Sequence, residues 1–100
     1  MLRHIVMWRF KDEAEGKTKL QNMEYVKERL LALKGVIPEI LHIELGFNIN
    51  KSDMAYDMVL LTEFEDEAAL ERYQNHPKHK EVSAYVSKVR TERAVADYIY

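Results

Sequence analysis

Alternating apolar and polar residues predict four β-strands in this chain. Successive side chains of a strand point to opposite faces of a sheet, so an alternation of period two marks a strand whose two faces differ. The second predicted strand shows this most clearly, because every second residue from Leu41 to Phe47 is apolar while His42 and Glu44 lie between them. The four predicted strands span residues 2–11, 40–48, 56–65 and 93–100.

Apolar residues at helical spacing predict a first helix after the first strand. The stripe runs from Leu20 to Leu33. Thr18 carries a hydroxyl of the kind that caps a helix N-terminus, and Gly35 is the residue type that often ends one. Residues 12–17, which precede the helix, are mostly charged and predict a loop.

A proline divides the second helical segment. Asp66 is expected to cap a helix that carries Leu70 and Tyr73. Proline lacks a backbone N–H and restricts the residue before it. This helix is therefore expected to stop at about His76, and a further helix is expected to start at Pro77.

The predicted elements follow one another in the order β-α-β-β-α-β. This order predicts an α+β fold of the ferredoxin-like type, in which four antiparallel strands form one sheet with helices on one of its faces. One hundred residues, of which 47% are hydrophobic, suit a single domain that spans residues 1–100.

Apolar residues on both faces of two strands predict a homodimer. One face of strands 2–11 and 56–65 carries His4, Val6, Trp8, Met58 and Leu60, and the other carries Ile5, Met7, Val59 and Leu61. Helices cover only one face of such a sheet, so we expect the same sheet of a second copy to cover the other and to close a barrel. An ion pair of Asp57 with Arg3 or Arg9 across that barrel is a further expectation.

Composition and charge exclude several classes of function. The net charge is −2, with 15 basic and 17 acidic residues spread along the chain, so no positive field favours nucleic acid or an anionic membrane. Cysteine is absent, which excludes disulfides and thiolate chemistry. Residues 1–10 include Arg3, His4 and Arg9, too many charges for a signal peptide or a membrane span, so we expect a cytoplasmic protein without a membrane partner.

Candidate chemistry gathers at the corner around Pro77. Tyr73, His76 and His79 have side chains that donate, accept or carry a proton near neutral pH. A corner of this kind can aim such groups into a cavity. The alternative is structural, because a tyrosine ring can pack and histidines can bond backbone groups at a helix corner.

Residues along nearly the whole chain carry a family resemblance. They are His4, Phe10-Lys11, Ile37-Pro38, Gly46-Phe47-Asn48, Tyr56-Asp57, Phe64, Tyr73, His76-Pro77-Lys78-His79 and Asp97-Tyr98. In number and order these residues resemble the stress-responsive α/β-barrel (Dabb) family. The resemblance implies a ferredoxin-like subunit and a dimeric α/β barrel.

The resemblance also implies an activity. A plant polyketide cyclase of the family uses a tyrosine and a histidine of this corner as its catalytic pair, and by position these match Tyr73 and His79. His79 would abstract a proton from a poly-β-keto substrate while Tyr73 polarises a carbonyl, giving aldol closure without a cofactor. The candidate ligand-binding residues, in a pocket between sheet and helices, are His4, Val6, Trp8, Met58 and Leu60.

Three functions stay open from the sequence. The first is a small dimeric barrel with a pocket for a small hydrophobic or polyketide-like ligand, acting in stress tolerance or as a binding protein. The second is a cofactor-independent cyclase or lyase-like enzyme. The third is a monooxygenase of a related dimeric barrel, which Trp8 suggests, although strand 2–11 lacks the asparagine of the Asn, Trp and His or Tyr set used there. His42 and Glu44 do not complete a set of metal ligands, so no metal site is predicted.

Overall fold

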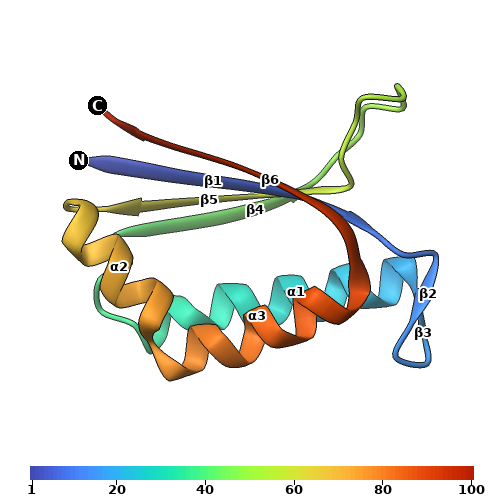
Figure 1. The fold of residues 1–100 in the computed structure, drawn as a ribbon, viewed down its shortest axis with the longest axis horizontal. Helices are drawn as coiled ribbons and strands as arrows, with labels where there is room; N and C mark the ends of the chain where they lie inside the picture. Colours follow the sequence, from blue (N-terminus) through green and yellow to red (C-terminus); the bar gives the residue numbers. More distant parts are fainter.

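The protein folds into two layers, a four-stranded sheet and a layer of helices on one of its faces (Figure 1). This computed structural model describes all residues 1–100. The strands of the sheet are β1 (Leu2–Phe10), β4 (His42–Phe47), β5 (Met58–Phe64) and β6 (Arg90–Ile99), and the helices are α1 (Lys19–Ala32), α2 (Glu67–Asn75) and α3 (Pro77–Val89). The strands are antiparallel in the order β4-β5-β1-β6, which confirms the predicted α+β ferredoxin-like fold.

The strand bounds differ from the prediction by a few residues. β4 and β5 are shorter than predicted at both ends. β6 begins at Arg90, three residues earlier than predicted, because α3 passes directly into it. There Arg90 pairs with Phe10, after a shift in the register between β1 and β6 at Arg9 and Phe10.

Helix α1 begins at the predicted cap. The Gln21 N–H donates to the Thr18 hydroxyl at 3.3 Å, and the Thr18 N–H donates to the Gln21 side chain at 2.9 Å. This reciprocal capping box satisfies two of the N–H groups that a helix start leaves without partners. After α1 the helical backbone continues as a short 3-10 turn, η1 (Leu33–Gly35). The helical segment therefore ends at Gly35, as predicted.

The corner between α2 and α3 forms as predicted. Asp66 caps α2 by accepting from the Ala69 N–H at 2.9 Å, and α2 ends at Asn75. His76 has extended backbone with φ −66° and ψ 134°, as expected of a residue before proline. Its Nδ1 accepts from the Lys78 N–H at 3.1 Å and so caps α3. His76 therefore has a structural role at this corner.

The predicted charged loop before α1 is a small hairpin. It consists of β2 (Glu13–Ala14) and β3 (Lys17–Thr18), joined by Glu15 and Gly16. Both turn residues have positive φ, 53° and 74°, which matches the type I′ turn that suits a two-residue hairpin. The prediction of a loop was wrong because glutamate before glycine is a weaker turn signal than asparagine or aspartate.

A buried asparagine ties this hairpin to two helices. The Asn22 amide donates to the Ala14 carbonyl at 3.0 Å, and its oxygen accepts from the Tyr85 hydroxyl at 2.5 Å. Asn22 is fully buried, so both bonds satisfy groups that water cannot reach. The contact joins β2, α1 and α3 at one end of the helix layer.

The core lies between the sheet and the helices. The side chains of β1 and β5 that face the helices are buried, which confirms the predicted alternation. Val6 and Phe64 meet Val26 of α1, Tyr73 of α2 and Val89 of α3 in one cluster of buried apolar residues. The lone tryptophan, Trp8, also belongs to this cluster.

No helix covers the other face of the sheet, which we call the outer face (Figure 1). Its centre is apolar, because Ile5 lies opposite Leu61 and Met7 lies opposite Val59 in the register. On the far side of β1, Ala94 and Ala96 continue this apolar centre onto β6. Met7 is 37% exposed. The predicted pattern of two apolar faces is therefore present.

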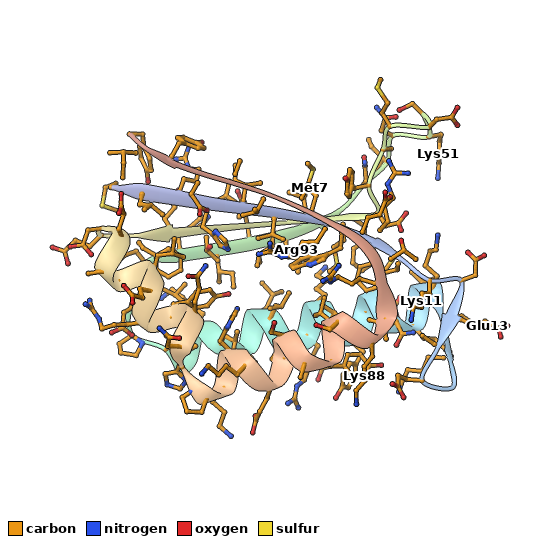
Figure 2. The ribbon with its side chains drawn as sticks, viewed as in Figure 1. Met7, Lys11, Glu13, Lys51, Lys88 and Arg93 are labelled. Atoms are coloured by element: carbon orange, nitrogen blue, oxygen red, sulfur yellow. The ribbon has the colours of Figure 1, made fainter.

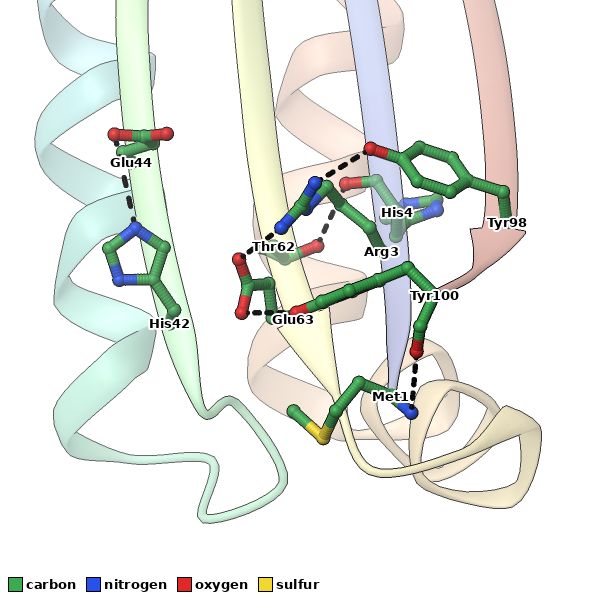
Figure 3. Close-up of polar contacts among 9 residues, drawn as sticks. All are labelled: Met1, Arg3, His4, His42, Glu44, Thr62, Glu63, Tyr98 and Tyr100. Carbon is green, nitrogen blue, oxygen red and sulfur yellow. Dashed lines mark hydrogen bonds and ion pairs between the residues drawn. The ribbon is translucent and has the colours of Figure 1, made fainter.

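Ion pairs flank the apolar centre of the outer face. At one end Arg3 lies 3.2 Å from Glu63 and donates to the Tyr98 hydroxyl at 2.9 Å, while the Tyr100 hydroxyl donates to Glu63 at 2.6 Å (Figure 3). That hydroxyl, together with Arg3, lowers the pKa of the Glu63 carboxyl. At the other end Arg9 lies 2.8 Å from Glu92.

The acidic residue expected to pair across a dimer has partners within the chain. Asp57 accepts from the Phe10 N–H at 2.7 Å and lies 3.6 Å from the Lys19 ammonium. Arg3 and Arg9 also have partners within the chain. The ion pair of Asp57 with either arginine was predicted between the two copies of a dimer, and it stays a prediction. None of the helices is both long and apolar enough to cross a membrane.

Candidate functional site

A cavity of about 310 Å³ lies between the sheet and α3. Strands β1, β5 and β6 form one wall, and helices α1, α2 and α3 form the other. The lining residues are His4, Val6, Trp8, Leu30, Leu60, Tyr73, His79, Val82, Ser83, Val86, Ser87, Arg90 and Arg93. The corner at Pro77 thus sends Tyr73 and His79 into a cavity, as the sequence suggested, while His76 stays outside the lining.

The structure places most of the predicted site residues on this cavity. His4, Val6, Trp8 and Leu60 line it together with the candidate pair Tyr73 and His79. Met58 is the exception. It lies at the first position of β5, opposite Trp8 on one side and Phe47 on the other, and it is 1% exposed. Its face of the sheet was predicted correctly, but its side chain belongs to the packed core beyond the end of the cavity.

Tyr73 is a buried phenol whose hydroxyl no group of the chain engages. Its side chain is 1% exposed, and its ring centroid lies 4.4 Å from that of His79 and 4.9 Å from that of Phe64. Burial raises the pKa of the Tyr73 hydroxyl, an effect that the positive charge of Arg93 partly opposes. The hydroxyl therefore stays protonated at neutral pH and can donate a hydrogen bond.

His79 has one ring nitrogen bonded and one available. Its Nδ1 lies 3.2 Å from the Gln74 carbonyl oxygen. A carbonyl oxygen only accepts, so Nδ1 carries the hydrogen and Nε2 of the neutral ring has a lone pair. Burial lowers the pKa of His79, and the positive charge of Arg93 adds to this effect. The ring is therefore neutral near pH 7, the state that a proton acceptor requires.

His4 is held by a carboxylate. Its Nδ1 bonds to the Asp97 side chain on the neighbouring strand β6, directly opposite in the register. A carboxylate that accepts from Nδ1–H fixes the tautomer of a histidine and leaves Nε2 free. His4 also lies at the edge of the Tyr73 ring, with 6.5 Å between the ring centroids. The Tyr73 ring thus lies near both histidine rings of the cavity, those of His4 and His79.

Sequence reasoning missed two arginines and two serines of the lining. Ser83 and Ser87 lie one helical turn apart on α3, and Arg90 and Arg93 come from the start of β6. Figure 2 shows Arg93 on the helix side of the sheet and Met7 on the other side. The signal was weak, because only the pairing of Arg93 with Trp8 fixes the face of β6 to which this arginine belongs.

The arrangement is suited to moving a proton. A neutral imidazole can accept a proton from carbon, and a protonated phenol beside it can donate to the oxygen on which charge then develops. Two other candidates from the sequence are not assembled. No asparagine lines the cavity beside Trp8. His42 and Glu44 are an exposed pair on β4, 3.9 Å apart (Figure 3), and neither lines the cavity.

Comparison with known proteins identifies the family. The model of the stress responsive A/B barrel domain, Dabb, matches residues 2–100. An uncharacterised protein of Streptomyces coelicolor is 32% identical over 98 residues, which cover 98% of each chain.

Among solved structures, a dimeric protein of unknown function with a ferredoxin-like fold from Bacteroides fragilis is 29% identical. It superimposes with a TM-score of 0.87 over 99% of this chain and 95% of its own. The hydroxynitrile lyase of Passiflora edulis superimposes with a TM-score of 0.85 over 99% of this chain and 92% of its own, at 16% identity, a likeness of fold. This chain belongs to the stress-responsive A/B barrel (Dabb) family.

Proposed function

We propose that this protein binds a small organic molecule in the cavity between the sheet and α3, and that it does so as a homodimer. The observation that carries the proposal is the composition of the cavity wall, where seven of thirteen residues, Tyr73 among them, are hydrophobic and the others include His4 and His79. Ligand sites are commonly apolar hollows of about 300–1,000 Å³ with a few polar groups that orient the ligand. The cavity, at about 310 Å³, suits a molecule of modest size.

The outer face of the sheet supports the homodimer. Its apolar centre at Ile5, Met7, Val59 and Leu61 is only partly covered within the chain, and ion pairs flank it at both ends. A two-fold axis brings the same patch of each copy against the other, so apolar centre meets apolar centre. A chain of this size also gains burial from a partner. The similar Bacteroides fragilis protein is dimeric.

Ligand binding can be tested with the protein's own fluorophore. Trp8 is the only tryptophan and lines the cavity, so its emission reports occupancy. Octan-1-ol is a neutral apolar probe of suitable size. We expect saturable binding by calorimetry together with a change in Trp8 emission. Ser83→Leu, which adds apolar volume to the cavity wall, serves as the control. The proposal would be contradicted if the protein bound neither octan-1-ol nor octanoate, the carboxylate of the same chain length, in a saturable way.

Acid–base catalysis without a cofactor is a second candidate function. It is favoured by the 4.4 Å separation of the Tyr73 and His79 rings and by the opposite shifts of their pKa values, which keep the phenol protonated and the imidazole neutral. Groups prepared in this way are common at sites of proton transfer. The Passiflora edulis protein shows that the fold hosts an enzyme, a hydroxynitrile lyase.

The proposed reaction begins with proton transfer from carbon. His79 Nε2 takes the proton from a carbon next to a carbonyl, and the electron pair of the C–H bond moves to the carbonyl oxygen. The Tyr73 hydroxyl donates a hydrogen bond to this enolate oxygen. The enolate carbon then attacks a second carbonyl of the same molecule and forms a C–C bond. The oxygen of that carbonyl takes the proton back from His79, so no oxidant, reductant or cofactor is required.

Isotope exchange tests the first step without knowledge of the substrate. In D₂O, His79 is expected to catalyse exchange of the protons next to the carbonyl of octan-2-one, followed by NMR. His79→Gln should lower this rate by about a hundredfold or more, the typical contribution of a general base. His42→Gln, which alters an exposed histidine of β4, is the matched control and should leave the rate unchanged. Wild-type protein without exchange above buffer, or an equal rate in His79→Gln, would refute the catalytic role.

A further inference from the structure

Two arginines from the start of β6 belong to the lining of the cavity. Arg90 is the residue at which α3 passes into β6, and its N–H still donates to the Val86 carbonyl of the helix. Arg93 follows on β6, opposite Trp8 in the register and on the helix side of the sheet (Figure 2). Both residues line the cavity. They come from one short segment at the start of β6.

These charges have no acidic partner within the chain. The arginines outside the cavity that pair with carboxylates are Arg3 with Glu63 at 3.2 Å, Arg9 with Glu92 at 2.8 Å and Arg72 with Glu39 at 3.1 Å. No such contact is made by Arg90 or Arg93, and none of the thirteen lining residues is acidic. Asp97, on the same face of β6, is already bonded to His4. A guanidinium group binds a carboxylate through two parallel hydrogen bonds, so an unpaired pair of arginines favours an anionic ligand.

The two ends of the cavity differ in chemistry. His79 lies in the first turn of α3 and Arg90 follows its last turn, roughly 16 Å further along the helix axis. Between these ends the wall is mostly apolar, with Val6, Leu30, Leu60, Val82 and Val86. The positive charge of Arg93 is close enough to lower the pKa of both Tyr73 and His79. A ligand with an anionic head and an apolar body therefore matches the composition of the wall, which combines two arginines with mostly apolar side chains.

We propose that the ligand of this cavity is an amphipathic organic acid whose carboxylate is bound by Arg90 and Arg93. Its apolar body lies against the apolar side chains of the wall. This inference rests on the proposed function of the cavity as a ligand site, and it specifies the chemical class of the ligand. A carbonyl of such an acid that lies near Tyr73 and His79 would meet the groups suited to proton transfer.

Paired ligands that differ in charge test this inference. Octanoate and octan-1-ol have the same chain length, and their affinities for the intact dimer can be compared by calorimetry. We expect the wild type to bind octanoate about tenfold more tightly than octan-1-ol, because hydrogen bonds to a charged group are the stronger kind. Arg93→Gln should lower the affinity for octanoate by about tenfold and the affinity for octan-1-ol by less than about twofold. The variant with both Arg90→Gln and Arg93→Gln should lower the affinity for octanoate further.

Two further variants separate charge from fold. Arg29→Gln makes the same substitution on the exposed side of α1, where Arg29 lies over the Tyr25 ring, and should change neither affinity. Arg93→Lys keeps the charge and is expected to retain part of the preference for octanoate, even if the glutamine variants fold poorly.

The outcomes distinguish this inference from the proposed function. Equal affinities for octanoate and octan-1-ol in the wild type, or a preference that both Arg93→Gln and Arg93→Lys leave unchanged, would overturn the carboxylate site while the cavity still binds a ligand. Failure of the wild type to bind either compound would overturn the ligand-binding function itself, and the inference with it.

Discussion

The two faces of the sheet hold their charged side chains in different ways. On the outer face Arg3 and Arg9 pair with carboxylates of neighbouring strands, and the centre between them is apolar. On the cavity face Arg93 has no carboxylate partner and the hydroxyl of Tyr73 is free. Buried polar groups are generally satisfied, so the free hydroxyl of the buried Tyr73 needs an explanation, and the exposed Arg93 adds an unpaired charge to the same cavity. The difference suggests that the outer face serves assembly and the cavity face serves a ligand.

A charge at the centre of the outer face should have the largest effect. Met7→Lys is expected to raise the dissociation constant of the homodimer by about a hundredfold or more, because the interface would have to bury an ammonium group without a partner. Sedimentation equilibrium measures this constant. Leu20→Lys, on the exposed side of α1, is the matched control and should leave the dimer intact. A Met7→Lys protein that dimerises like the wild type would place the interface elsewhere.

Filling the cavity should abolish most ligand binding without affecting assembly. Ser83→Leu adds apolar volume to the α3 wall of the cavity. We expect octan-1-ol and octanoate to bind about tenfold more weakly, since the cavity is at the small end of the range for ligand sites. Calorimetry measures both affinities. Ser52→Leu, in the exposed segment between β4 and β5, should bind like the wild type. Unchanged affinity in Ser83→Leu would show that the ligand lies in a different place.

Tyr73 and Tyr85 differ in whether the side-chain hydroxyl has a hydrogen-bond partner. The Tyr85 hydroxyl bonds to Asn22, whereas the Tyr73 hydroxyl has no partner within the chain. Tyr85→Phe should therefore lower the free energy of unfolding by about 1–2 kcal/mol, because it leaves a buried amide oxygen without its donor. Tyr73→Phe should change the free energy of unfolding by less than about 0.5 kcal/mol. The same variant should slow the exchange of octan-2-one protons in D₂O.

Urea unfolding of the two variants measures these differences. A larger loss in Tyr73→Phe than in Tyr85→Phe would mean that the Tyr73 hydroxyl has a structural role, and the view of the cavity face as a ligand site would lose one of its supports.

The sequence predicted the fold well because its signals are local. The alternation of β1 and β5 fixed which residues face the helices, and Asp66 and Pro77 fixed the ends of α2 and α3 through capping and the missing N–H. The corner that holds Tyr73 and His79 could be found for the same reason. Alternation does not show how far along a strand a cavity extends, so Met58 was assigned to the ligand site although it lies in the packed core.

The place of Arg93 in the candidate site depends on pairing between strands distant in sequence. From Arg93 to Tyr98 one face of β6 mixes polar and apolar side chains and the other carries two alanines and a tyrosine, so its pattern alone does not reveal that the mixed face meets the helices. The pairing of Arg93 with Trp8 and of Asp97 with His4 decides this. These contacts span most of the chain and could not be derived from local pattern.

The smallest expected effect is a dependence of stability on pH at the cavity face. Burial lowers the pKa of His79 in the folded protein below the ordinary value of about 6.5 that applies when the chain is unfolded. Between these two pKa values the unfolded chain binds a proton at this residue that the folded chain does not bind. The free energy of unfolding should therefore rise with pH across this window and fall as the pH is lowered from about 7 through 6.5.

Urea unfolding of the wild type and His79→Gln over this range measures the effect. Glutamine can still donate to the Gln74 carbonyl but does not titrate, so the variant should show a shallower rise. Contributions from the carboxyl groups of Glu39 and Glu63, whose pKa values are lowered from 4.5, fall at more acidic pH and cancel in the comparison. A steeper rise in the variant would show that His79 is protonated more readily in the folded protein, contrary to the role of a neutral base beside Arg93.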